Sequence, residues 1–147
     1  MEPTVCPLQN SGCLEKQDKI IQLLFPKKFN KDVLYNTLMS FGSDKSNFDR
    51  NKVSQDTLVP GCQSDLYLYE IYCDGRLFFF TYTEALISSG IAHLFSQVYS
   101  GEHPETILTC KPIFFEKLSQ YLSIGRVNGG DSIYMRMKQI AVRYLTS

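Results

Sequence analysis

The stretch DLYLYEIYCDGRLFFFTYT, residues 65–83, decides the fold of this chain. Its first eight residues alternate in the manner of an extended strand, with Leu66 and Leu68 on one face and Tyr67 on the other. Residues 76–83 are dense in aromatic side chains, which strands favour. Between the two runs lies Asp74-Gly75, a strong signal for a two-residue hairpin turn. The stretch therefore predicts an antiparallel hairpin, to which residues 57–59 add a short strand.

Helices are predicted before and after this hairpin. Apolar residues recur at helical spacing over 15–25 and over 30–42, where Asn30 suits an N-cap. The most regular pattern is the broad apolar stripe of residues 84–101, which a capping box of Thr81 and Glu84 would start and Gly101 would end. Helices that flank a small antiparallel sheet make an α+β fold.

The last third of the chain predicts more helices. Two short segments each carry a proline near a helix start, at Pro104 and Pro112. Residues 123–131, SIGRVNGGD, are glycine-rich and predict a turn. A terminal amphipathic helix follows over residues 133–145.

The bulk composition predicts one domain over residues 1–147. The 15 basic residues equal the 15 acidic ones, so no charge footprint favours nucleic acid or an anionic membrane as partner, and a protein partner is expected instead. No run reaches the roughly 18 apolar residues of a membrane span, and the start lacks the basic and apolar regions of a signal peptide. These features favour a cytoplasmic protein.

The five cysteines differ in their surroundings. Cys62 lies in VPGCQS, between a glycine and two polar residues, which is typical of a thiol presented on a loop rather than packed in a core. All five are scattered along the chain and are expected to be reduced, because an odd number leaves one unpaired and a chain of this length folds without disulfides. Cys6 and Cys13 lack the spacing of zinc ligands, so no metal site is predicted. Cys73 and Cys110 are expected to be bystanders, and neither His93 nor His103 is assigned a role.

Several segments together resemble the SufE family. They are VLYNTLMSFG (33–42), LVPGCQSDLYLY (58–69), ISSGIAHLFSQVYSGEHPETIL (87–108), FFEKL (114–118) and YLSIGRVNGGDSIYMRMKQIA (121–141). The resemblance begins near residue 30, and residues 1–28 form a weakly matched extension and first helix that inherits nothing from it. It implies the fold that SufE shares with IscU-like scaffolds.

The resemblance also implies a function. A SufE protein is a sulfur carrier rather than an enzyme: it accepts sulfane sulfur from a SufS-type cysteine desulfurase, stimulates that enzyme and passes the sulfur to a SufBCD-type scaffold for iron–sulfur cluster assembly. Pyridoxal phosphate belongs to the desulfurase, so no cofactor is expected here beyond a transient persulfide. By motif position Cys62 is the acceptor, Gly61, Gln63 and Ser64 shape its loop, and Arg126 supports the thiolate or the desulfurase interface.

The sequence departs from the family pattern at four places. Asp65 stands where glutamine is common, Tyr67 where many members have tryptophan, Ser89 where lysine is frequent, and Gly125 where serine is usual. These departures concern docking and the choice of desulfurase, and they leave the thiol untouched.

Persulfide transfer sets its own demands on the acceptor. The acceptor must reach a buried donor, be a thiolate when it attacks, and shield its persulfide from reductants. A loop that retracts and extends around Cys62 would meet the first and third demands. Two alternatives stay open: an iron–sulfur scaffold, which needs about three thiolates close together, and an acceptor that feeds another sulfur-using pathway.

Overall fold

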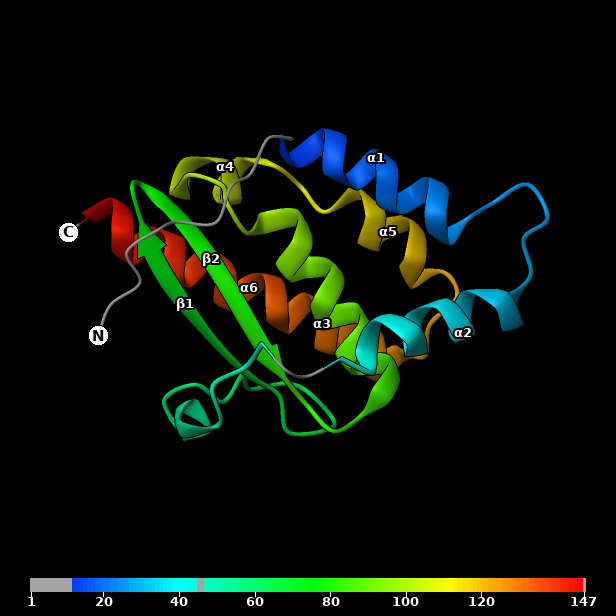
Figure 1. Ribbon diagram of the computed structural model, residues 1–147, viewed down its shortest axis with the longest axis horizontal. Helices are drawn as coiled ribbons and strands as arrows, with labels where there is room; N and C mark the ends of the chain where they lie inside the picture. Colours follow the sequence, from blue (N-terminus) through cyan, green and yellow to red (C-terminus); the bar gives the residue numbers. More distant parts are fainter. Residues whose placement is uncertain (1–11, 45–46, 147) are drawn as a thin grey trace.

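The computed structural model describes residues 12–44 and 47–146 as an α+β fold (Figure 1). In chain order the elements are α1 (Cys13–Leu24), α2 (Lys31–Gly42), the 3-10 helix η1 (Arg50–Lys52), β1 (Tyr67–Cys73), β2 (Arg76–Tyr82), α3 (Leu86–Tyr99), α4 (Pro104–Thr109), α5 (Ile113–Ser119) and α6 (Ile124–Thr146). The hairpin lies at one side of the molecule, α3 runs beside it, and α1, α2 and α5 lie beyond α3 (Figure 1).

The predicted antiparallel hairpin is present. β1 pairs antiparallel with β2 from Tyr67 opposite Tyr82 to Cys73 opposite Arg76. Asp74 and Gly75 both have positive φ, 52° and 80°, as the tight turn requires. The short strand expected at 57–59 is wrong as a strand: only Leu58 bridges to Tyr67, because Pro60 and Gly61 turn the chain away at once.

Helix α3 is the centre of the core. It packs on β2 and crosses α2, where a Cβ on Gly90 would lie 2.0 Å from the Leu38 carbonyl oxygen. The predicted capping box is wrong, because Thr81 belongs to β2 and the helix begins at Leu86 after Ala85 without a side-chain cap. The Glu84 carboxylate instead accepts a hydrogen bond from the Tyr82 hydroxyl.

The glycine-rich turn predicted over 123–131 is also wrong, since α6 begins at Ile124 and runs through all of its glycines. Glycine weakens an isolated helix by about 1 kcal/mol relative to alanine, which is why the pattern favoured a turn. Here tertiary packing overrides that preference. A Cβ on Gly130 would lie 2.1 Å from the Phe115 ring, so the aromatic side chain of α5 can pack directly on the α6 backbone.

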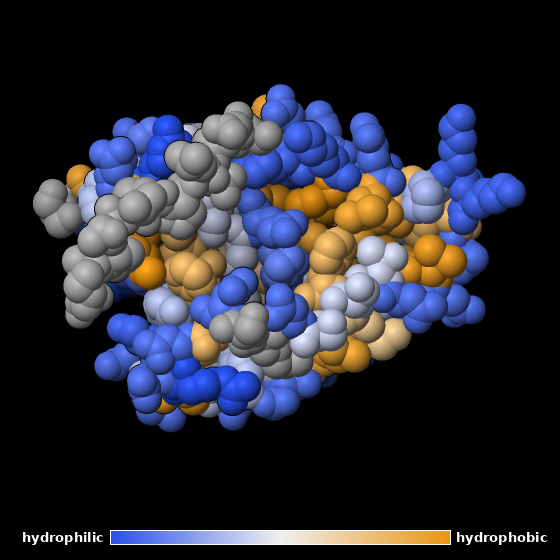
Figure 2. Space-filling view, viewed as in Figure 1, coloured by the Kyte–Doolittle hydropathy of each residue, from blue (hydrophilic) through white to orange (hydrophobic). Residues whose placement is uncertain are grey.

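The surface in the same view is mixed. Apolar side chains gather between α1 and α2, and hydrophilic ones occupy most of the margin (Figure 2). A shallow groove there is lined by Leu23, Val33 and Phe41. Within the described residues, no helix is both long and apolar enough to cross a membrane.

Candidate functional site

The segment that carries Cys62 is a closed loop. At its base, the Val59 amide donates a hydrogen bond of 2.8 Å to the Leu66 carbonyl, and both side chains are buried. The Arg136 guanidinium of α6 donates to the Leu58 carbonyl at 2.8 Å. Residues 60–65 therefore extend from a fixed base, and their backbone can move without breaking the hairpin.

The tip of the loop lies along one face of α6. Gly61 is next to Ser132, the Cys62 sulfur is 3.9 Å from the Gly129 carbonyl oxygen, and the Gln63 side chain covers Gly125. Positions 125, 129 and 132 follow the i, i+4, i+7 spacing of one helix face. The loop therefore runs antiparallel to the helix, in contact with it at each of its three central residues.

Glycine is required at position 61 for two reasons. Its φ is +91°, a backbone conformation that residues with a side chain rarely adopt. A Cβ there would also lie 2.4 Å from the Ser132 hydroxyl oxygen. A residue with a Cβ would be strained at this φ and would require the Ser132 hydroxyl to move.

A small cavity of about 100 Å³ opens beside the Cys62 sulfur. Leu66 and Ile91 supply apolar side chains to its wall, and Gly129 and Arg126 come from α6. A water molecule takes up about 30 Å³ in liquid water, so the volume of the cavity exceeds that of one additional sulfur atom.

The half-buried position of Cys62 affects its ionisation. Burial raises the pKa of the Cys62 thiol above its ordinary value, because the thiolate loses hydration. In this loop position the thiol is protonated at neutral pH and weakly nucleophilic.

Arg126 lies in the first turn of α6 and lines the same cavity as Cys62. Its guanidinium carbon is 5.8 Å from the centre of the Tyr35 ring, within range of a cation–π contact. The Tyr35 hydroxyl in turn donates to the Tyr121 carbonyl at 2.7 Å. The arginine is thus held at the rim of the site by α2, and its role toward the thiolate stays a prediction.

Of the loop residues named from the sequence, Gly61 and Gln63 contact α6 directly, and Ser64 lines the cavity. Gly125, Gly129 and Ser132 were not predicted as parts of the site. The signal was present in their spacing, but the glycines were interpreted as a turn, which hides a helical period.

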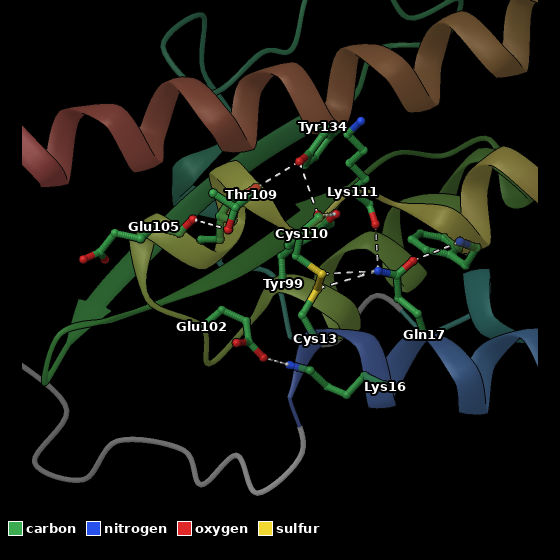
Figure 3. Close-up of a disulfide and its surroundings, with 12 residues drawn as sticks. Cys13, Lys16, Gln17, Tyr99, Glu102, Glu105, Thr109, Cys110, Lys111 and Tyr134 are labelled. Atoms are coloured by element: carbon green, nitrogen blue, oxygen red, sulfur yellow. Dashed lines mark hydrogen bonds and ion pairs between the residues drawn. A yellow bond between two sulfur atoms is a disulfide. The ribbon is translucent and has the colours of Figure 1, made fainter.

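The expectation of reduced cysteines is wrong for three of the five. Cys13 on α1 and Cys110 after α4 form a disulfide across 97 residues of sequence (Figure 3). Cys73 is disulfide-bonded as well. A sequence cannot show which distant cysteines have Cα atoms close enough to bridge, so only the packing of α1 on the later helices reveals the pair. Cys62 is the one free cysteine among the described residues, and Cys6 lies outside them.

A hydrogen-bonded cluster surrounds this disulfide. The buried Gln17 amide donates to the Lys111 carbonyl and accepts from the Phe114 amide, both at 2.9 Å, and its nitrogen lies 3.4 Å from the Cys110 sulfur. One turn away, Lys16 forms an ion pair of 2.7 Å with Glu102, and Figure 3 shows both on the same side of the disulfide. The Cys13–Cys110 disulfide therefore belongs to a packed contact between α1 and the segment that joins α4 to α5.

The described residues contain no group of three histidine, cysteine or acidic side chains placed to hold a metal ion. His93 stacks on Phe41, where burial lowers the pKa of its imidazole. His103 lies with Nδ1 2.8 Å from the Gly75 carbonyl oxygen. Both histidines thus have contacts away from Cys62.

Comparisons with known proteins agree on one family. The model for "SufE: Fe-S metabolism associated domain" matches residues 20–141. The chain is 31% identical over 117 residues to the cysteine desulfuration protein SufE of Wigglesworthia glossinidia brevipalpis, covering 76% of this chain and 81% of that protein. It is 28% identical over 97 residues to the protein of the same name from Plasmodium falciparum, a match of 61% of this chain and 39% of the longer relative.

A solved structure shares the fold. The solution structure of a hypothetical protein from Thermus thermophilus matches with a TM-score of 0.72 over 90% of this chain and 97% of that one. The two sequences are 19% identical.

Proposed function

Because the chain belongs to the SufE family, whose members carry sulfur in iron–sulfur metabolism, we propose that it accepts persulfide sulfur on Cys62 from a SufS-type cysteine desulfurase. It stimulates the desulfurase by removing this sulfur and passes it on for iron–sulfur cluster assembly, with a SufBCD-type scaffold as the recipient. The observation that carries the proposal is a free thiol on a closed loop above a cavity large enough for one more sulfur.

The transfer step balances without a cofactor on this chain. The Cys62 thiolate attacks the outer sulfur of the desulfurase persulfide, a new S–S bond forms, and the donor S–S bond breaks. The electron pair of the broken bond leaves with the donor cysteine as a thiolate. No net oxidation occurs, and the proton that Cys62 lost is available to the donor.

The docked loop suits the resting state before sulfur is accepted. With the raised pKa of Cys62 and its contact with α6, the resting thiol reacts slowly with stray electrophiles. Release of the loop from α6 would restore hydration to the thiol and lower its pKa toward the ordinary value before the loop enters the desulfurase. Arg126, at the rim of the cavity, is placed to hold the emerging thiolate or an acidic group of the partner.

The iron–sulfur scaffold alternative receives less support. A scaffold needs several thiolates near one another, whereas Cys13, Cys73 and Cys110 are all engaged in disulfides. Anaerobic incubation with iron and sulfide, followed by visible absorbance, tests the alternative, and a stable cluster spectrum would support the scaffold.

The decisive experiment is intact mass spectrometry after incubation with a SufS-type desulfurase and cysteine. The wild-type protein should gain about 32 Da, the mass of one sulfur atom in a persulfide. Cys62→Ser should gain nothing while it still binds the desulfurase. Sulfur found on another cysteine, or on the Cys62→Ser variant, would overturn the assignment.

A further inference from the structure

Gly125 leaves a gap in α6, and the Gln63 side chain fills it. A Cβ built on Gly125 would lie 2.2 Å from Cδ of Gln63 and 2.3 Å from both its terminal nitrogen and its terminal oxygen. No real Cβ approaches other atoms so closely. The Gln63 amide therefore occupies the volume that any other residue at position 125 would need.

The next position along the same helix face is different. A Cβ on Gly129 would lie 3.9 Å from the Cys62 sulfur, which is an ordinary van der Waals contact. Of the two α6 glycines that the loop covers, Gly125 therefore has the closer fit, and it faces the residue directly after Cys62.

We infer that Gly125 and Gln63 form a steric latch that positions Cys62 on α6 and sets how often its thiol is accessible. Gln63 is the residue adjacent to Cys62, so its amide can lie in the gap only when the loop is docked. Loss of the gap shifts the loop toward the undocked state, in which the thiol leaves the cavity. The latch concerns the accessibility of Cys62, and only its role in sulfur transfer rests on the proposed function.

Substitution of Gly125 by alanine probes the latch without damage to the helix. The atoms that must move are the far end of a flexible and exposed side chain, so α6 itself need not shift. Alanine is also the best helix former, and Gly125 already has a helical conformation. Gly125→Ala should therefore keep or raise the melting temperature while it displaces the Gln63 amide.

The first test is the alkylation rate of Cys62 by a bulky maleimide in the protein alone. Gly125→Ala should raise this rate about two- to fivefold, since the van der Waals contacts of one amide are individually weak. Asn128→Ala is the matched control, because it adds an alanine on an exposed position of the same helical turn and should leave the rate unchanged. Rates measured over a range of pH separate accessibility from a change in the pKa of the thiol.

A double-mutant cycle identifies the partner of Gly125. Gln63→Ala alone should raise the alkylation rate about as much as Gly125→Ala, and the double variant should react no faster than Gln63→Ala alone, since no amide is left to displace. An unchanged rate in Gly125→Ala would overturn the latch. Fully additive effects of the two substitutions would overturn it as well, because they would place the action of Gly125 elsewhere.

The second test uses the desulfurase. If the undocked loop is the competent state, Gly125→Ala should lower the desulfurase concentration that gives half-maximal sulfur acceptance by the same factor and leave the maximal rate unchanged. A structural defect would instead lower the maximal rate. If the wild-type protein accepts no sulfur at all, the proposed function fails, whereas the alkylation experiment still decides the latch on its own.

Discussion

Cys62 and the pair Cys13–Cys110 show two opposite uses of sulfur in one chain. Cys62 is half-buried on a loop that is hydrogen-bonded at its base and rests on α6 at its tip, and its thiol is free. Cys13 is 5% exposed and is bonded to Cys110 inside a cluster of hydrogen bonds around Gln17. Under the proposed function the first site moves and reacts, whereas the second stays in place. If this division holds, a change at one site should leave the function of the other intact.

The largest expected effect is the loss of sulfur acceptance in Cys62→Ser. The hydroxyl of serine is a far weaker nucleophile than a thiolate, so transfer from the desulfurase should fall to background. The free energy of unfolding should change by less than about 1 kcal/mol, since Cys62 lies on a loop at the surface. Mass spectrometry checks the sulfur transfer, and urea denaturation checks the stability. A large loss of stability would mean that Cys62 also supports the fold.

The next effect is on stability. Cys13→Ala combined with Cys110→Ala should lower the free energy of unfolding by about 2–5 kcal/mol, because the disulfide closes a long loop in the unfolded chain. Sulfur acceptance at Cys62 should persist below the new melting temperature. Urea denaturation without reductant measures the first part, with Cys62→Ser as the control that keeps the disulfide.

Two outcomes of that experiment would break the comparison. An unchanged denaturation midpoint would mean that the pair is not oxidised in the purified protein. Loss of sulfur acceptance in a variant that is still folded would mean that the two sites are coupled.

Arg126→Ala should have a smaller effect, and mainly on the desulfurase. The exposed part of this side chain contributes about 0–1 kcal/mol to stability, so melting should change little. Stimulation of the desulfurase should weaken several-fold, and Arg126→Lys should recover only part, because lysine keeps the charge but loses the planar fork of donors. A desulfurase titration that is the same for Arg126→Ala and wild type would reduce Arg126 to a surface residue.

The smallest effect concerns pH. Since burial raises the pKa of the Cys62 thiol, its alkylation by a small reagent should be slower at pH 7–8 than that of a peptide containing residues 57–68. The rate should continue to rise at pH values where the peptide has already reached its plateau. A midpoint at or below that of the peptide would show that the thiol is hydrated in the folded protein.

The same shift has a consequence for stability. The unfolded chain releases the Cys62 proton at a lower pH than the folded chain does. The contribution of the buried neutral thiol to the free energy of unfolding is therefore complete below the pKa that Cys62 has in the unfolded chain. It declines as the pH rises through the pKa that Cys62 has in the folded chain. Cys62→Ser should remove this part of the pH dependence, which denaturation midpoints at neutral and alkaline pH would show.

Much of the architecture could be predicted from local patterns. The hairpin follows from two-residue alternation around Asp74-Gly75, and α2 and α3 follow from apolar side chains at helical spacing. The errors arose where a local preference was overruled by a neighbour distant in sequence. Residues 124–131 are helical, and Phe115 and the Cys62 loop pack against their glycines. The strand at 57–59 shrank to a single bridge at the turn through Pro60.

By itself the sequence predicted Cys62 as the thiol of interest and placed it on a loop, because glycine, proline and polar neighbours around a cysteine are visible without a fold. Only the tertiary structure decided what the loop rests on and which cysteines are joined. Gln63 and Gly125 are 62 positions apart, and Cys13 and Cys110 are 97 apart. Contacts of this kind depend on how α1 and α6 pack against the rest of the chain. Packing distances between remote segments leave no periodic trace in the sequence, since each residue is compatible with many neighbours until the fold selects one.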